Sequence, residues 1–196
     1  MIRARGMARR FGEKRALARV DLDLGAGEFL LVTGPNGSGK TTLLRLLSGL
    51  IVPTAGDLQV GVDRSRIGFL GHEPLVYREL TPLENLDLYG RLYRVPERRE
   101  RIGMLLERFG LWEARRTRAA ALSRGMLQRL AICRTLLHEP ELLLLDEPFS
   151  SLDADGAELL LDELARQDAR RTVVLASHQP ERLAGHASGH LALAPA

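Results

Sequence analysis

The sequence is poor in cysteine, lysine and aromatic residues, and it contains no long hydrophobic run. Cys133 is the only cysteine, which excludes an intrachain disulfide and a cysteine-based metal site and suits a reducing cytoplasm. The apolar runs, such as LLLL at 142–145, are far shorter than the roughly 20 residues of a membrane-spanning helix. The N-terminal stretch MIRARGMARRFG lacks the apolar region of a secretory signal. If the protein acts at a membrane, we expect another chain to supply the span.

The positive charge is carried almost entirely by arginine, because lysine occurs only at Lys14 and Lys40. The arginines are scattered, apart from short groups near 98–101 and 115–118, and the formal net charge is only +3. Such a distribution is more typical of a solvated surface than of a nucleic-acid interface, so we expect no nucleic-acid partner. A length of 196 residues suits one domain with a core, or one domain with a small insertion.

The periodicity of the first part predicts strands followed by a helix. Val20, Leu22 and Leu24 alternate with polar residues, and an apolar run follows at 29–32, which together predict a half-exposed strand and a buried one. Helical spacing covers 40–50, and short strands are expected within 56–62 and 67–71.

A helical block interrupts this pattern over roughly 73–124. Thr81, Pro82 and Glu84 have the spacing of a capping box with proline in the first turn, and a second amphipathic helix is expected over 96–109. Beyond the block we expect a helix over 123–137, a buried strand in 141–148, a helix over 156–167 and a strand in 171–178. Strands that alternate with helices predict an α/β fold with a parallel sheet.

The stretch TGPNGSGKTTLL, residues 33–44, fits the phosphate-binding pattern G-x-x-x-x-G-K-[ST] between a predicted strand and a predicted helix. The backbone of such a loop wraps a phosphate chain at the positive end of a helix. Lys40 would reach the β- and γ-phosphates, and the Thr41 hydroxyl would bind Mg²⁺. The alternative is a flexible turn that happens to contain lysine. The predicted ATP-binding residues here are Gly34, Pro35, Asn36, Gly37, Ser38, Gly39, Lys40, Thr41 and Thr42.

Two carboxylates end the apolar stretch LLLLDEP at 142–148. After a phosphate-binding loop, Asp146 is expected in the Mg²⁺ shell, and Glu147 beside the γ-phosphate, where it would orient or deprotonate water. Solvated acids at the end of a strand are the alternative.

The segment LSRGMLQR at 122–129 resembles the signature sequence of the ATP-binding-cassette (ABC) family. Leu122, Ser123 and Gly125 match that signature, whereas Arg124 and Met126 depart from it. Ser123 is a helix-cap candidate whose hydroxyl, with the Gly125 N–H and the helix end, makes an anion site. The family implies that Ser123 and Gly125 bind the γ-phosphate of an ATP held by the other subunit of a head-to-tail dimer. An ordinary helix cap is the alternative.

Other segments resemble the same family. SSLD at 150–153 is similar to the D-loop that crosses the dimer interface, and His178 to the switch histidine that contacts the γ-phosphate. Phe11 matches the aromatic residue that stacks on adenine, although a core phenylalanine is nearly as good a reading. Residues 74–86 resemble the start of the helical subdomain that grips a membrane partner.

One position departs from the family pattern. His72 stands where the family has a glutamine that touches Mg²⁺ and the attacking water, and we hypothesise that it couples nucleotide state to the helical subdomain. Together, GHEP, LDEPFSSLDADG and SHQP, which places Gln179 and Pro180 after His178, resemble the ATP-binding subunit of the haem exporter of cytochrome c maturation.

The resemblance implies an ABC-type P-loop NTPase with a mostly parallel sheet, an N-terminal antiparallel β subdomain and an inserted helical subdomain at about 73–124, all within one nucleotide-binding domain over 1–196. It implies ATP and Mg²⁺ as ligands and Lys40, Glu147 and His178 as catalytic residues. The expected partners are a second copy and membrane-spanning transporter subunits, at the cytoplasmic face of the cell membrane. Haem export is the expected role. Another exported cargo (lipid, peptide or drug), a soluble ABC ATPase and a P-loop kinase with a small acceptor are the alternatives.

Overall fold

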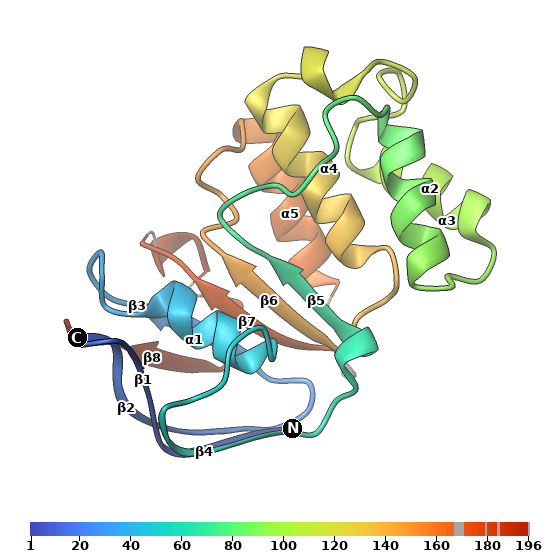
Figure 1. Ribbon diagram of the computed structural model, residues 1–196. Coiled ribbons are helices and arrows are strands. Elements are labelled where there is room, and N and C mark those ends of the chain that lie inside the picture. Colours follow the sequence, from blue (N-terminus) through green and yellow to red (C-terminus); the bar gives the residue numbers. More distant parts are fainter. Residues whose placement is uncertain (167–170, 179, 184, 196) are drawn as a thin grey trace. The chain divides into compact units, whose positions relative to one another are not determined.

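The computed structural model describes the whole chain except residues 167–170, 179, 184 and 196. It forms two compact units (Figure 1): the first comprises Met1–Gly71, Glu141–Glu147 and Gln167–Ala196, and the second His72–Pro140 and Pro148–Arg166. Residues 73–124, which the sequence assigned to a helical subdomain, belong to the second unit. The single domain over 1–196 remains a prediction.

A five-stranded parallel sheet forms the centre of the first unit, in the order β5-β6-β7-β3-β8. Every residue of the neighbouring strands β6 and β7 is buried, as expected of a parallel sheet covered on both faces. This confirms the predicted strands and the α/β class. The strands are β3 (Phe29–Thr33), β5 (Ile67–Leu70), β6 (Leu142–Asp146), β7 (Thr172–Ala176) and β8 (Gly189–Ala192).

A second, antiparallel sheet of the first unit contains β1 (Ile2–Phe11), β2 (Lys14–Leu24) and β4 (Ala55–Val60) in the order β2-β1-β4. The antiparallel N-terminal sheet implied by the family resemblance is therefore present. In β1 the alternation of buried side chains breaks between Ala4 and Met7, where the register shifts and Gly6 has φ 54°. This bulge hides the strand from a search for period two.

Helix α1 (Lys40–Leu47) packs against β2 of the antiparallel sheet and against β6 and β7 of the parallel one. Its leucines at 43, 44, 46 and 47 are completely or almost completely buried in a core shared by both sheets. Truncating one of them to alanine would cost about 2–5 kcal/mol, because the cavity cannot fully collapse. The core therefore fixes the helix that follows the phosphate-binding loop.

The second unit is helical and contains α2 (Pro82–Leu92), α3 (Arg98–Arg108), α4 (Arg124–Leu136) and α5 (Ala154–Ala165). The capping box predicted for α2 is confirmed: Thr81 N–H donates to Glu84 Oε2 at 2.8 Å, and Glu84 N–H donates to Thr81 Oγ1 at 3.2 Å. Cys133 is completely buried and belongs to the core. Short 3₁₀ helices cover Arg64–Arg66, Ala119–Ala121 and Pro180–Leu183.

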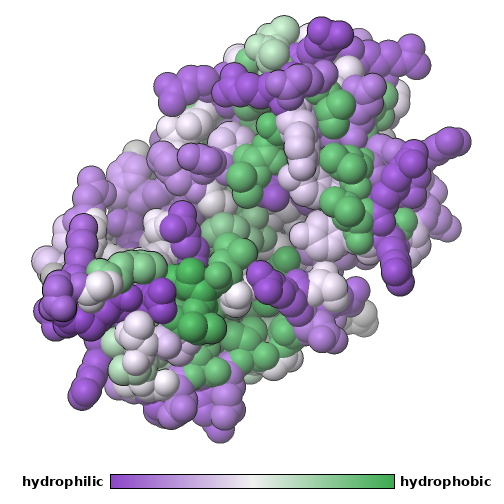
Figure 2. Space-filling model, viewed as in Figure 1, coloured by the Kyte–Doolittle hydropathy of each residue, from purple (hydrophilic) through white to green (hydrophobic). Residues whose placement is uncertain are grey.

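Figure 2 shows hydrophilic side chains projecting over much of the visible face, with hydrophobic residues between them. The largest exposed fractions among the bulky hydrophobic residues belong to Val52 (69%) and Leu92 (68%). In the described part of the chain, no helix combines the length and the apolar character needed to cross a membrane.

Candidate active site

Three neighbouring strands of the parallel sheet carry the predicted site segments at their carboxyl ends. The phosphate-binding loop follows β3, Asp146 ends β6 with Glu147 directly after it, and His178 comes just after β7. The order β6-β7-β3 places these ends side by side, and the ladder continues past them: Glu147 N–H donates to Ala176 O (2.9 Å) and Ser177 N–H to Val32 O (3.0 Å). Ligands of open α/β sheets bind at this edge.

The loop from Gly34 to Gly39 depends on glycine at both ends. Gly34 has φ 147° and Gly39 has φ 98°, and a Cβ atom at either residue would lie 2.5 Å from a backbone carbonyl oxygen, of Leu193 and Ala16 respectively. Any other residue would force the loop to move. Gly39 is also the residue from which α1 begins, so the tight turn delivers the chain directly into the helix.

A buried hydroxyl lies within this loop. Ser38 is only 1% exposed, and its Oγ has no hydrogen-bond partner among the described residues. Pro35, Asn36 and Gly37 beside it are exposed. A buried donor without a partner costs free energy, which a bound phosphate oxygen would offset.

Lys40 is 7% exposed, which is rare for a lysine. Its Nζ donates to the carbonyl oxygens of Gly34 (2.8 Å) and Pro35 (3.4 Å) and lies 3.9 Å from Glu147 Oε1. The ammonium group is thus held against the loop predicted to bind phosphates, and it faces the candidate catalytic carboxylate.

Thr41 and Asp146 meet as the sequence predicted. Thr41 Oγ1 donates to Asp146 Oδ2 at 2.7 Å, and Asp146 is only 2% exposed. Oxygen atoms of this kind are the ligands that Mg²⁺ prefers, usually one or two from the protein together with substrate phosphates and water. The pair therefore fits the predicted metal. Thr42, the next residue, is half-buried in the first turn of α1.

Glu147 and His178 form the second pair at this edge. Glu147 Oε2 accepts a hydrogen bond from His178 N–H (3.1 Å) and lies 2.7 Å from His178 Nδ1. Because an ionised carboxylate can only accept, Nδ1 carries the proton in this arrangement. Glu147 also has φ 50°, the left-handed region, which costs a residue with a side chain about 1–3 kcal/mol and is typical of functional sites.

Two further predicted residues lie around α4 in the second unit. Ser123 caps this helix, because its Oγ accepts from Met126 N–H at 3.2 Å. A Cβ atom on Gly125 would lie 3.5 Å from Asp153 Cγ and 3.5 Å from Ser151 O, so the signature segment borders the SSLD segment within one protomer. The sequence predicted this cap. The cap agrees equally well with an anion-binding site at Ser123 and with an ordinary helix cap, so it does not decide between them.

His72 and Phe11 are both exposed. His72 is the first residue of the second unit, while Phe11 ends β1 in the first. Phe11 is 49% exposed, and the Arg9 guanidinium carbon lies 4.5 Å from its ring centroid. The alternative reading of Phe11 as a core residue is therefore wrong, and its ring is accessible for stacking. Gln179 lies outside the described residues.

Support for the loop comes from a strand that the sequence reading missed. Leu193 N–H, just after β8, donates to Thr33 O at 2.8 Å, and His190 Nε2 lies 2.7 Å from Thr33 Oγ1. Both contacts fix the residue that precedes Gly34. The alternating apolar residues of HLALA, at 190–194, are the signal that could have revealed this edge strand.

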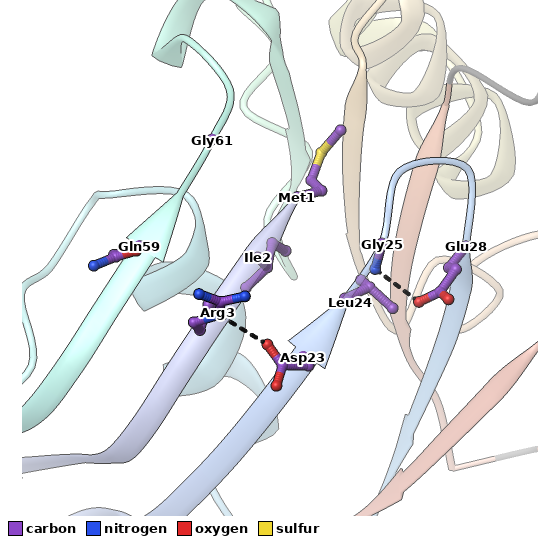
Figure 3. A pocket seen from close by; sticks show the side chains of 9 residues that line it. All are labelled: Met1, Ile2, Arg3, Asp23, Leu24, Gly25, Glu28, Gln59 and Gly61. Carbon is purple, nitrogen blue, oxygen red and sulfur yellow. Dashed lines mark hydrogen bonds and ion pairs between the residues drawn. The ribbon is translucent and has the colours of Figure 1, made fainter.

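A separate pocket of about 520 Å³ lies at one end of the antiparallel sheet (Figure 3). Its polar groups are bound to one another: Arg3 Nε contacts Asp23 Oδ1 at 3.3 Å, and Glu28 Oε2 accepts from Gly25 N–H at 2.8 Å. None of the predicted site residues lines it, so it is distinct from the predicted phosphate site. The lining residues are Met1, Ile2, Arg3, Asp23, Leu24, Gly25, Glu28, Gln59 and Gly61.

A glycine-framed loop, a buried lysine and a Thr–Asp pair at the carboxyl edge of a parallel sheet define a P-loop nucleotide site. The model of the ABC transporter family matches residues 17–150 of this chain. The chain belongs to that family, and its fold is that of an ABC ATPase domain.

The relatives have varied roles by name. The uncharacterized ABC transporter ATP-binding protein YxlF of Bacillus subtilis is 36% identical over 184 residues, which cover 91% of this chain and 62% of that protein. The daunorubicin resistance ATP-binding protein DrrA3 of Streptomyces coeruleorubidus is 40% identical over 185 residues, 89% of this chain and 58% of that protein. The chain thus spans about three fifths of these two relatives.

Solved structures share the fold over nearly the whole chain. An ATP-binding subunit of an ABC transporter superposes with a TM-score of 0.89 at 26% identity, covering 98% of this chain and 85% of that one. The cassette MJ0796, a dimer in a post-hydrolysis state bound to ADP and Pi, gives 0.84 at 30% identity, with 98% and 94% covered.

Proposed function

We propose that this chain binds and hydrolyses ATP and that the hydrolysis powers an ABC transporter. The observation that carries the proposal is the meeting of Lys40, the Thr41–Asp146 pair and the Glu147–His178 pair at one edge of the parallel sheet. A flexible turn gives no reason to bury a lysine in this place, whereas bound MgATP does: the lysine offsets the phosphate charge, and the carboxylates serve the metal and the attacking water.

In this mechanism the backbone N–H groups within residues 34–42, where only Pro35 has none, wrap the phosphates, and Phe11 stacks on adenine. Lys40 Nζ exchanges the Gly34 carbonyl for the β- and γ-phosphate oxygens, which are stronger acceptors. Thr41 and Asp146 would hold Mg²⁺, which supplies charge neutralisation at the phosphates when bound.

Glu147 orients or deprotonates the attacking water, and His178 stabilises the γ-phosphate end. Their contact at 2.7 Å keeps both groups at the edge where the reaction would occur. Phosphoryl transfer needs little covalent chemistry from a protein, so catalysis here is positioning together with electrostatic stabilisation.

Two copies of the chain would share each ATP. One copy holds the triphosphate in its P-loop, and Ser123 and Gly125 of the other cover the γ-phosphate. The dimeric state of the related cassette MJ0796 with ADP and Pi supports this arrangement. Because ATP binds the closed pair better than the separate chains, hydrolysis would loosen the dimer and produce motion.

The membrane partner and the cargo complete the proposal. The second unit, with His72 at its beginning, would couple the nucleotide state to membrane-spanning subunits at the cytoplasmic face. Haem is the proposed cargo, on the strength of the segments GHEP, LDEPFSSLDADG and SHQP. The relatives favour no single cargo, because their names include daunorubicin resistance and aliphatic sulfonate import.

Fractionation and affinity capture test the transporter role. The chain should sediment with membranes, and affinity capture should bring down membrane-spanning subunits. The cargo is tested separately, by measuring haem transport in vesicles that contain the complex. A chain that stays in the soluble fraction without membrane partners would favour a soluble ABC ATPase, and transfer of phosphate to a small acceptor would favour a kinase. Unchanged basal and partner-stimulated ATPase in His72→Ala would remove the role of His72.

A further inference from the structure

One arginine joins three segments of the second unit. Arg129 lies in α4, downstream of Ser123, and its side chain is 13% exposed. Its Nη1 donates to Phe109 O at 3.3 Å, and its Nη2 lies 3.3 Å from Asp153 Oδ2. Phe109 is the C-cap residue of α3, and the carbonyl groups at the C-terminal end of a helix favour a cation. The guanidinium fork therefore binds the end of one helix and the start of another.

Asp153 is the last residue of SSLD, and its two oxygens have different partners. Oδ1 accepts from Gly156 N–H at 3.0 Å and caps α5, while Oδ2 receives Arg129. The cap alone would fix the carboxylate relative to α5. The second contact ties the same residue to α4, so the position of SSLD depends on Arg129.

The signature segment packs on the other side of this contact. Gly125 borders both residues, because a Cβ atom placed on it would lie 3.5 Å from Asp153 Cγ and 3.5 Å from Ser151 O. Gly156 gives the Arg129 side chain room, because a Cβ atom there would lie 3.3 Å from Arg129 Cδ. Signature segment, SSLD and Arg129 thus form one packed cluster within the second unit.

We propose that Arg129 is a positioning residue that holds the signature segment (Leu122–Gly125) and SSLD (Ser150–Asp153) in one fixed arrangement. In this arrangement both segments face the ATP that a second copy binds. The inference rests on the proposed function. The planar guanidinium binds these two acceptors through two separate nitrogens in a fixed geometry, whereas methionine has no donor and lysine has a single nitrogen without such a fork. Arg129 itself touches no reacting atom, and it acts through Asp153.

The test measures ATP-driven dimerisation in the full chain with Glu147→Gln, which slows hydrolysis. Arg129→Met keeps the apolar stem, and Asp153 remains hydrated because it is 52% exposed, so the variant should fold. We expect the ATP concentration at half-dimerisation, from sedimentation velocity, to rise about tenfold or more. The ATP affinity of the monomer, measured with a fluorescent analogue at low protein concentration, should change less than about twofold, since the P-loop is intact.

Arg101→Met is the matched control. Arg101 has the same character, with a side chain 14% exposed, a contact to Leu136 O at 3.1 Å and an ion pair with Glu139 at 3.3 Å, but it serves the opposite end of α4. It should lower the melting temperature without moving the dimerisation midpoint. Arg129→Lys should fall between the parent and Arg129→Met.

Asp153→Asn keeps the helix cap and removes the charge, so it should shift the midpoint as Arg129→Met does, and the double variant should add little to either. If both variants dimerise at the same ATP concentration as the Glu147→Gln parent, the inference is overturned, even when the parent itself dimerises with ATP as proposed. A parent that stays monomeric with ATP would instead overturn the shared-ATP function, and this inference with it.

Discussion

The two units use buried charge in different ways. In the first, Lys40, Asp146 and Glu147 gather where strands end, and their contacts run among the predicted site groups themselves. In the second, a buried carboxylate, Glu163, is 4% exposed and pairs with Arg108 at 2.7 Å between two helices. The first arrangement is ready to exchange partners with a ligand, whereas the second holds helices together. Burial of charge is thus informative about function only when the geometry around it is open to substrate.

Positive φ angles at non-glycine residues occur in both units of the described chain, at Leu75 (50°), Arg94, Glu97 (45°) and Glu139 in the second and at Glu147 in the first. In the second unit, Arg94 and Glu139 have φ 54° and 52°, and each follows the end of a helix, where the left-handed conformation ends helices commonly. Glu147 has φ 50° at the end of a buried strand, where no such local reason exists. The strain at Glu147 belongs to the site.

The largest effect is expected at Lys40. Lys40→Ala should lower ATPase activity about a thousandfold and weaken ATP binding, because the phosphates lose their main counter-charge. Steady-state phosphate release and calorimetric titration with ATP measure the two effects. Lys14→Ala, which changes the only other lysine, an exposed one on β2, is the control and should behave as wild type. Unchanged affinity in Lys40→Ala would contradict the phosphate-binding loop.

Breaking the buried pair of the second unit should cost stability. Arg108→Met removes the 2.7 Å contact to the buried Glu163 carboxylate and should reduce the free energy of unfolding by about 3 kcal/mol. Arg91→Met, which removes an exposed partner of Asp87, should cost less than about 1 kcal/mol. Urea denaturation compares them. Equal losses would show that burial does not distinguish these pairs.

Strain at Glu147 predicts an unusual ranking of two inactive variants. Glu147→Gly and Glu147→Ala both lose the carboxylate, but glycine tolerates φ 50° and alanine does not. We expect the glycine variant to be more stable by about 1 kcal/mol, in contrast to the usual preference for alanine. Thermal unfolding in the absence of nucleotide decides the ranking, and a more stable alanine variant would refute the strain.

The smallest effect is expected at low pH, where the ion pairs of Asp87 are lost. The hydrogen bond from Arg98, and then that from Arg91, hold the pKa of Asp87 below its ordinary value. The stabilisation is therefore complete above the ordinary aspartate pKa and disappears as pH falls through the lowered one. The difference in melting temperature between wild type and Asp87→Asn should shrink below pH about 4. A constant difference down to low pH would exclude this ion pair as its source.

The sequence was informative wherever a motif and a period coincided. Residues 33–44 carry both, so the loop and α1 could be predicted, and so could the capping box of α2. The roles of Lys40 and Thr41 stay predictions. The bulge at Gly6 disrupts the period of β1, and the short edge strand β8 offers too few residues to stand out. Contacts such as Arg129 with Asp153 join distant residues of ordinary type, so no local pattern announces them.

The proposal that two copies share each ATP is tested most directly by sedimentation velocity of the Glu147→Gln chain with and without MgATP. We expect a monomer without nucleotide and a dimer with it, and a return to monomer when Ser123→Arg blocks the covering site. A nucleotide-loaded Glu147→Gln chain that remains monomeric at saturating MgATP, alone and beside its membrane partner, would contradict it.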